Sequence, residues 1–81
     1  MYLEIITPEK KVFEGEITSV KVPGIEGSFE ILNNHAPIVS ALDKGEVRVK
    51  TTKGEVLQYQ VEGGVLEMMN NKVSLLLEVL L

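Results

Sequence analysis

Apolar and polar residues alternate with a period of two along much of this chain, and this pattern most constrains its fold. In residues 46–51 and 56–61, β-branched, aliphatic or aromatic side chains occupy every second position. Because successive side chains of a strand point to opposite faces, each run predicts a half-buried strand. Residues 52–55 lie between the two runs, and Gly54 can adopt a positive φ without steric cost. We therefore expect a β-hairpin here.

Similar short runs, separated by Gly, Pro and Asn, continue through the rest of the sequence. We count about nine, including separate strands at residues 11–13 and 17–22 with a turn at residues 14–16. No capped run of ten or more residues shows helical periodicity. The sequence therefore predicts one all-β domain over residues 1–81, either a sandwich or a barrel. The last run, residues 72–79, is apolar on both faces, which favours a central strand or contact with a partner.

The composition narrows the possible functions. With two Phe, two Tyr and no Trp, the core must be aliphatic. The net charge is −4, whereas a protein that binds a nucleic-acid duplex needs a basic face, so we expect no nucleic-acid partner. The absence of Cys excludes a disulfide framework and a thiolate metal site. The N-terminus lacks a signal peptide, and the longest apolar stretch is far shorter than the ~20 residues of a membrane-spanning helix. We expect a soluble protein that can still be peripheral to a membrane.

Groups that could carry chemistry are scarce. His35 is the only histidine, and no nucleophile or orienting group lies near it in the sequence, so we interpret it as a turn residue. The sequence has no zinc-ligand spacing, no Asp-rich calcium loop and no Gly-Lys-Ser or Gly-Lys-Thr phosphate loop. We therefore predict no catalytic residue, no metal and no cofactor.

Lys53 suggests a different class of protein. It lies at the expected hairpin tip of an acidic, all-β domain, the general design of biotinyl and lipoyl carrier domains. The two-fold repeat of such carriers is missing, and a solvated turn lysine is the commoner interpretation. A carrier domain and a stand-alone β-sandwich adaptor remain the alternative hypotheses.

Five segments, ordered and spread over the whole chain, are more specific than any single motif. One is His35-Ala36-Pro37, followed by apolar residues. The others are residues 3–15, the turn-containing residues 23–32, a Gly-x-Val strand at 45–49, and Gly-Gly followed by apolar and acidic residues at 63–67. Together they resemble the epsilon subunits of F-type ATP synthases.

This resemblance implies a ten-stranded, mostly antiparallel β-sandwich that docks on the gamma subunit in the central stalk. It also implies proximity to the c subunits of the rotor ring, rotation with that ring, and a part in coupling proton flow to ATP synthesis. Catalytic residues would belong to other subunits. The implied location is the cytoplasmic face of the bacterial inner membrane, with membrane association only through the complex.

The resemblance also implies contact residues. The turn at Glu26, Gly27 and Ser28 matches the rotor-ring contact, and the segment from His35 to Pro37 matches a gamma contact. Pro37 fixes its own φ and keeps the preceding residue extended, which gives the loop a defined exit into the next strand. A purely structural turn explains this segment equally well.

The C-terminus departs from the resemblance. Typical epsilon subunits continue into a two-helix hairpin that can block rotation, whereas this sequence ends at Leu81. We therefore expect inhibition by such helices to be absent. We also expect Leu76, Leu80 and Leu81, without helices to cover them, to bury against gamma or against another copy of the chain.

Overall fold

The computed structural model describes residues 1–78, which form eight β-strands and no helix. Neighbouring strands are antiparallel except β1 and β8, which run parallel. The predicted all-β, mostly antiparallel fold is therefore confirmed. In chain order the strands are β1 (Tyr2–Ile6), β2 (Lys11–Gly24), β3 (Gly27–Leu32), β4 (Ile38–Leu42), β5 (Gly45–Thr51), β6 (Val56–Val61), β7 (Gly64–Met69) and β8 (Lys72–Leu77).

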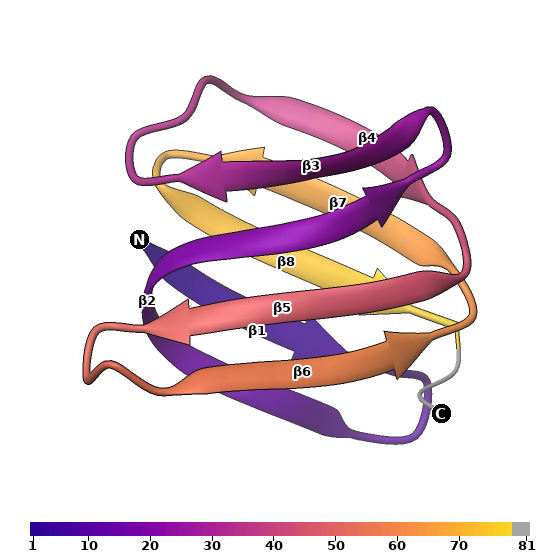
Figure 1. The fold of residues 1–81 in the computed structure, drawn as a ribbon, viewed down its shortest axis with the longest axis horizontal. Helices are drawn as coiled ribbons and strands as arrows, with labels where there is room; N and C mark the ends of the chain where they lie inside the picture. Colours follow the sequence, from indigo (N-terminus) through magenta and orange to yellow (C-terminus); the bar gives the residue numbers. More distant parts are fainter. Residues whose placement is uncertain (79–81) are drawn as a thin grey trace.

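The strands lie in two layers with the core between them (Figure 1). One layer consists of β3, the second half of β2, β5 and β6. The other consists of β4, β7, β8, β1 and the first half of β2. We call the outward surface of the first layer the front face and that of the second layer the back face.

The predicted turn at residues 14–16 is wrong, and β2 is one strand of 14 residues. Its first half pairs with β1, and its second half pairs with β3 and β5, so the strand passes from one layer to the other. Gly15 lies before this crossing, where an added Cβ would come within 3.4 Å of the Phe13 ring. Glycine inside a strand commonly marks a bend rather than an end. Because the two expected short strands merge, the nine expected strands become eight within residues 1–78. The ten strands implied by the resemblance are not found in this part of the chain.

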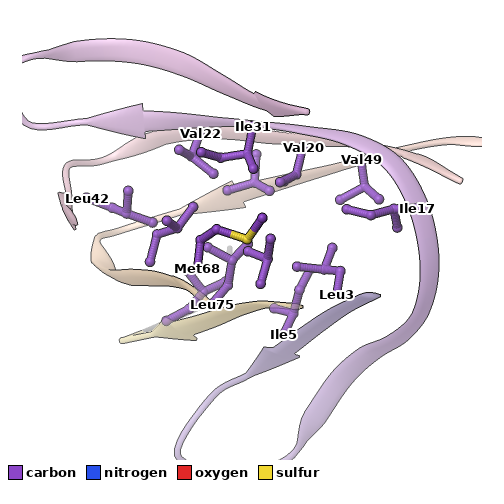
Figure 2. Close-up of a cluster of buried hydrophobic side chains, with 14 of the residues drawn as sticks. Leu3, Ile5, Ile17, Val20, Val22, Ile31, Leu42, Val49, Met68 and Leu75 are labelled. Atoms are coloured by element: carbon purple, nitrogen blue, oxygen red, sulfur yellow. The ribbon is translucent and has the colours of Figure 1, made fainter. Parts of the chain in front are cut away.

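The core is aliphatic, as the composition predicts (Figure 2). Side chains from both layers meet in it, including Leu3 and Ile5 from β1 and Leu75 from β8, which are fully buried. Phe13, Phe29 and Tyr59 are only partly buried and pack at its margin. Each strand therefore turns its alternating apolar set inward, and its other set forms the front or back face.

Candidate functional site

The loop from residue 33 to residue 37 connects β3 to β4 and contains three of the predicted gamma contacts. His35, Ala36 and Pro37 are all exposed. The backbone N–H of His35 donates to the Leu32 carbonyl at 3.1 Å, and its Nδ1 lies 2.7 Å from the Ala36 carbonyl oxygen. A carbonyl can only accept, so this contact places a proton on Nδ1. The ring is thus engaged with its own loop, as expected for a turn residue.

A single side chain ties this loop to the β7–β8 turn. Asn71 Nδ2 donates to Asn33 Oδ1 at 2.9 Å, and the backbone N–H of Asn34 donates to Asn71 Oδ1 at 2.8 Å. Both ends of one amide group are therefore used. Asn70 and Asn71 form the β7–β8 turn, and both adopt positive φ there. The sequence carries no signal that the side chain of Asn71 would hold a loop 37 residues away.

The predicted rotor-ring contacts lie at the opposite end of the sandwich (Figure 1). Glu26, Gly27 and Ser28 are exposed at the β2–β3 turn, and Gly27 has a φ of +126°. Ile25 stands beside them with 62% of its surface exposed, an apolar residue that the sequence analysis did not single out. The structure therefore does not bring the two predicted contact segments together, since the length of β3 separates them.

The back face carries an apolar row that crosses four strands. Ala41, Val65, Leu76 and Ile6 are successive cross-strand neighbours on β4, β7, β8 and β1. Part of this row lines a shallow, open groove together with Pro8. Leu76 was predicted to contact a partner, and 50% of its surface is exposed on this row. Leu80 and Leu81 lie outside the described residues.

The front face is polar by contrast. Lys21 on β2 lies between Glu30 on β3 and Arg48 on β5. Arg48 Nη2 also contacts Glu46 Oε1 at 3.3 Å along the same strand. Gln58 continues the row onto β6. Charged and polar side chains thus fill this row, so it is well suited to remain in water.

A group of interacting polar side chains occupies the part of the back face formed by β1 and the first half of β2. Lys11 Nζ lies 3.1 Å from Glu14 Oε1 and 3.2 Å from Glu4 Oε2, and these carboxylates raise the pKa of Lys11. A hydrogen bond from the Tyr2 hydroxyl, followed by that from Lys11, lowers the pKa of Glu14. The same bond raises the pKa of Tyr2. Lys72 Nζ lies 5.8 Å from the centre of the Tyr2 ring, within the range of a cation–π contact.

The described residues offer little other chemistry. Within residues 1–78, no group of three or more His, Cys, Asp and Glu side chains could hold a metal ion. Among the same residues, no helix is long and apolar enough to cross a membrane. Lys53 is exposed in the β5–β6 turn, as the hairpin prediction required. The surface features that remain are the two ends of the sandwich and its back face, which are suited to contacts with other proteins.

Comparison with known proteins decides the family. Residues 1–80 match the family described as "ATP synthase, Delta/Epsilon chain, beta-sandwich domain". The chain belongs to this family. It is 45% identical over 76 residues to the ATP synthase epsilon chain of Chlorobium limicola, covering 94% of this chain and 86% of that one. It is 47% identical over 75 residues to the epsilon chain of Leptospira borgpetersenii, covering 91% of this chain and 58% of that one.

Solved structures show the same fold. A chain from the Euglena gracilis mitochondrial ATP synthase, in a structure of its OSCP, F1 and c-ring, superposes with a TM-score of 0.90 at 20% identity. The match covers 98% of this epsilon-type domain and 51% of that chain. A chain from the central stalk and c-ring structure of the Tetrahymena thermophila enzyme gives a TM-score of 0.84 at 21% identity, with coverages of 100% and 65%. The β-sandwich predicted from the sequence is therefore the fold of this family.

Proposed function

We propose that this chain is a central-stalk subunit of an F-type ATP synthase, which docks on the gamma subunit and the rotor ring. In this role it helps couple ion flow to ATP synthesis and turns with the rotor. The observation that carries the proposal is the family match over residues 1–80, together with 45% identity to a chain named ATP synthase epsilon chain. The proposed location is the cytoplasmic face of the bacterial inner membrane, reached only through the complex.

The subunit is proposed to be non-catalytic. Its only histidine is engaged with the Ala36 carbonyl, and no nucleophile is bonded to it among the described residues. Nucleotide chemistry would then belong to other subunits. The family gives no reason to treat Lys53 as a carrier lysine, and its exposure is that of any turn residue.

The two ends of the sandwich are proposed to serve two partners. The segment from His35 to Pro37, with Leu76 and Leu80, would contact gamma, and the turn at Glu26, Gly27 and Ser28 would contact the c subunits. The exposure of both segments and their separation along β3 support this division. Leu76 would extend the gamma contact along the back face toward the turn at Glu26, because its neighbour Val65 pairs with Ala41, whose carbonyl accepts from the Ile25 N–H. A domain with two separate contact segments could bind the gamma subunit and the rotor ring at the same time, as the proposed coupling role requires.

Co-purification with the gamma subunit from the same organism tests the proposal. We expect a stable one-to-one complex at micromolar concentrations, measured by size-exclusion chromatography with light scattering. An interface of standard size buries roughly 1,600 Å² in total, about 800 Å² of it on each partner. If the folded chain fails to bind gamma at micromolar concentration, the proposed function is wrong and only the fold remains.

A further inference from the structure

We infer that the free edge of β6 pairs with the β6 edge of a second copy of this chain, antiparallel about a two-fold axis at Gln58. This inference goes beyond the proposed function and involves neither gamma nor the rotor ring. β6 is the last strand of its layer and is hydrogen-bonded to β5 alone. Its other edge therefore presents backbone N–H and C=O groups that no strand within residues 1–78 pairs.

The other free edges of the sandwich are protected, whereas β6 is not. The first half of β2 carries Lys11 and Glu14, and β3 carries Glu30. The uncharged strand β4 is bonded near its end by the β2–β3 turn, where the N–H of Ile25 donates to the Ala41 carbonyl. β6 has no charged residue and no proline, and it pairs with β5 over its whole length without a bulge. Charges, proline and bulges are what keep edge strands from pairing with another chain, so β6 is open to such pairing.

The two surfaces of β6 limit how two copies can pair. Leu57 and Tyr59 are half-buried and pack against the core, whereas Val56, Gln58 and Gln60 are exposed on the front face. Residues that lie opposite each other point to the same face, so the two-fold axis must pass through a residue and not between two residues. An axis at Gln58 sets Leu57 opposite the partner's Tyr59. It also sets Val56 opposite the partner's Gln60, so both surfaces of the layer continue across the pair.

Charges at the ends of the strand favour this axis. It sets Glu62 opposite the partner's Gly54, which is next to Lys53 in the β5–β6 turn. An added Cβ at Gly54 would meet no atom within 4 Å, so the carboxylate has room there. Within residues 1–78, neither Lys53 nor Glu62 has an opposite charge within 4.0 Å. Each copy thus brings a free cation to a free carboxylate of the other, and the two-fold axis repeats this contact.

The alternative axis, at Tyr59, brings like charges together. It pairs as many residues of β6, but it sets Glu55 opposite the partner's Gly63. A Cβ at Gly63 would lie only 3.5 Å from Glu78 Oε2, so two carboxylates would meet at each end of the pair. The charges therefore select Gln58 as the residue on the axis.

The pair is expected to be weak and independent of the contacts proposed for gamma. One strand from each copy buries far less than the roughly 1,600 Å² of a standard interface, so we expect a dissociation constant on the order of 100 μM. β6 lies on the opposite side of the sandwich from the β3–β4 loop (Figure 1). The dimer should therefore leave that loop accessible.

Sedimentation velocity of the folded chain, from about 5 μM to about 1 mM, tests the inference. We expect Gln58→Lys to weaken dimerisation at least about tenfold, since it sets two cations opposite each other on the axis. The matched control is Leu32→Lys, because Leu32 is 55% exposed on β3, the other edge strand of the layer. This control should dimerise as the wild type does. Circular dichroism melting of each variant shows that a loss of pairing is not a loss of folding.

Disulfide formation tests the position of the axis, because the chain has no native Cys. Only Gln58 lies opposite itself in the inferred dimer, so Gln58→Cys should give a disulfide-linked dimer under mild oxidation. Gln60→Cys would face the partner's Val56, and it should cross-link at least about tenfold more slowly.

The outcomes separate the inference from the proposed function. A wild type that stays monomeric to about 1 mM overturns the inference, as does an equal loss of pairing in Leu32→Lys. Cross-linking through Leu76→Cys in place of Gln58→Cys would put the second copy on the back face, which also overturns it. Gln58→Lys should bind gamma as the wild type does. If the wild type fails to bind gamma, the proposed function fails, and the dimer is still judged by sedimentation and cross-linking.

Discussion

The front and back faces of this sandwich arise from the same alternation, yet they expose different chemistry. On the front, Lys21 has the acid Glu30 on one side and a second cation, Arg48, on the other. Arg48 is in turn paired with Glu46 on its own strand. On the back, Val65 and Leu76 are neighbours in an apolar row. The fold requires apolar residues only at the inward positions of each strand, so the outward positions can carry either polar or apolar residues. Leu32 and Val56 are exposed on the front, but four large apolar side chains are exposed on the back: Val39, Val65, Met69 and Leu76. The larger apolar set on the back face is therefore the better candidate for a contact with another protein.

Paired substitutions on β8 test whether the back face contributes to stability or only to binding, and the largest effect is expected here. Leu75 is fully buried, whereas the next residue, Leu76, is 50% exposed on the back face. Leu75→Ala should lower the free energy of unfolding by about 2–5 kcal/mol, because it leaves a cavity. Leu76→Ala should change it by less than about 0.5 kcal/mol. Urea denaturation measures both. If both variants lost the same free energy of unfolding, Leu76 would contribute to stability as a core residue does. The back face could then not be distinguished from the core on this ground.

Substitutions in the β7–β8 turn test whether the hydrogen bonds from this turn to the β3–β4 loop stabilise the fold. Asn70 and Asn71 both have positive φ, 51° and 59°, so replacement by Ala strains the backbone similarly at both positions. Only Asn71 also bonds the loop at Asn33 and Asn34. We expect Asn71→Ala to lose roughly 1 kcal/mol more than Asn70→Ala, the usual net contribution of such hydrogen bonds.

Urea denaturation gives this difference, and titration with gamma extends it to binding. If the Asn71 amide orders the loop that carries His35, Asn71→Ala should weaken gamma binding more than Asn70→Ala does. Identical stabilities of the two variants would show that the bonds to the loop contribute nothing. The loop would then owe its shape to Pro37 and to its own backbone.

Most of the fold could be predicted from local patterns. The alternation in residues 46–51 and 56–61, and Gly54 between them, predicted β5, β6 and their turn. The wrong prediction of a turn at residues 14–16 also has a local cause. Glycine flanked by two glutamates resembles a turn, and only the pairing of both halves of β2 with different strands shows that the chain continues.

The candidate surface was harder to predict than the fold. Leu76 and the segment from His35 to Pro37 could be selected from the sequence, but Glu67, an exposed acid on the same face as Leu76, could not. Its neighbours across the sheet are Val39 on β4 and Ser74 on β8, and registers between strands far apart in sequence leave no local signal. The hydrogen bonds from Asn71 to the loop also join residues far apart in sequence, so no local pattern predicts them.

The smallest expected effect concerns the polar group on the β1 and β2 part of the back face. The folded structure lowers the pKa of Glu14, through Tyr2 and then Lys11, so its carboxylate stabilises the fold above the unfolded pKa of about 4.3. That contribution is lost as the pH falls through the lower, folded pKa. Lys11 has a raised pKa, so its contribution is complete below about pH 10.4 and is lost as the pH rises through the folded value.

Glu14→Gln should therefore melt at a lower temperature than the wild type near neutral pH. The difference should shrink as the pH falls below about 4, because the wild type then loses the same interaction. Glu46→Gln on the front face changes the net charge equally and serves as the control for general charge effects. Since Glu14 is exposed, the shift should be the smallest of the series. A difference that stays constant from pH 7 to pH 3 would show that Glu14 acts through packing rather than through its charge.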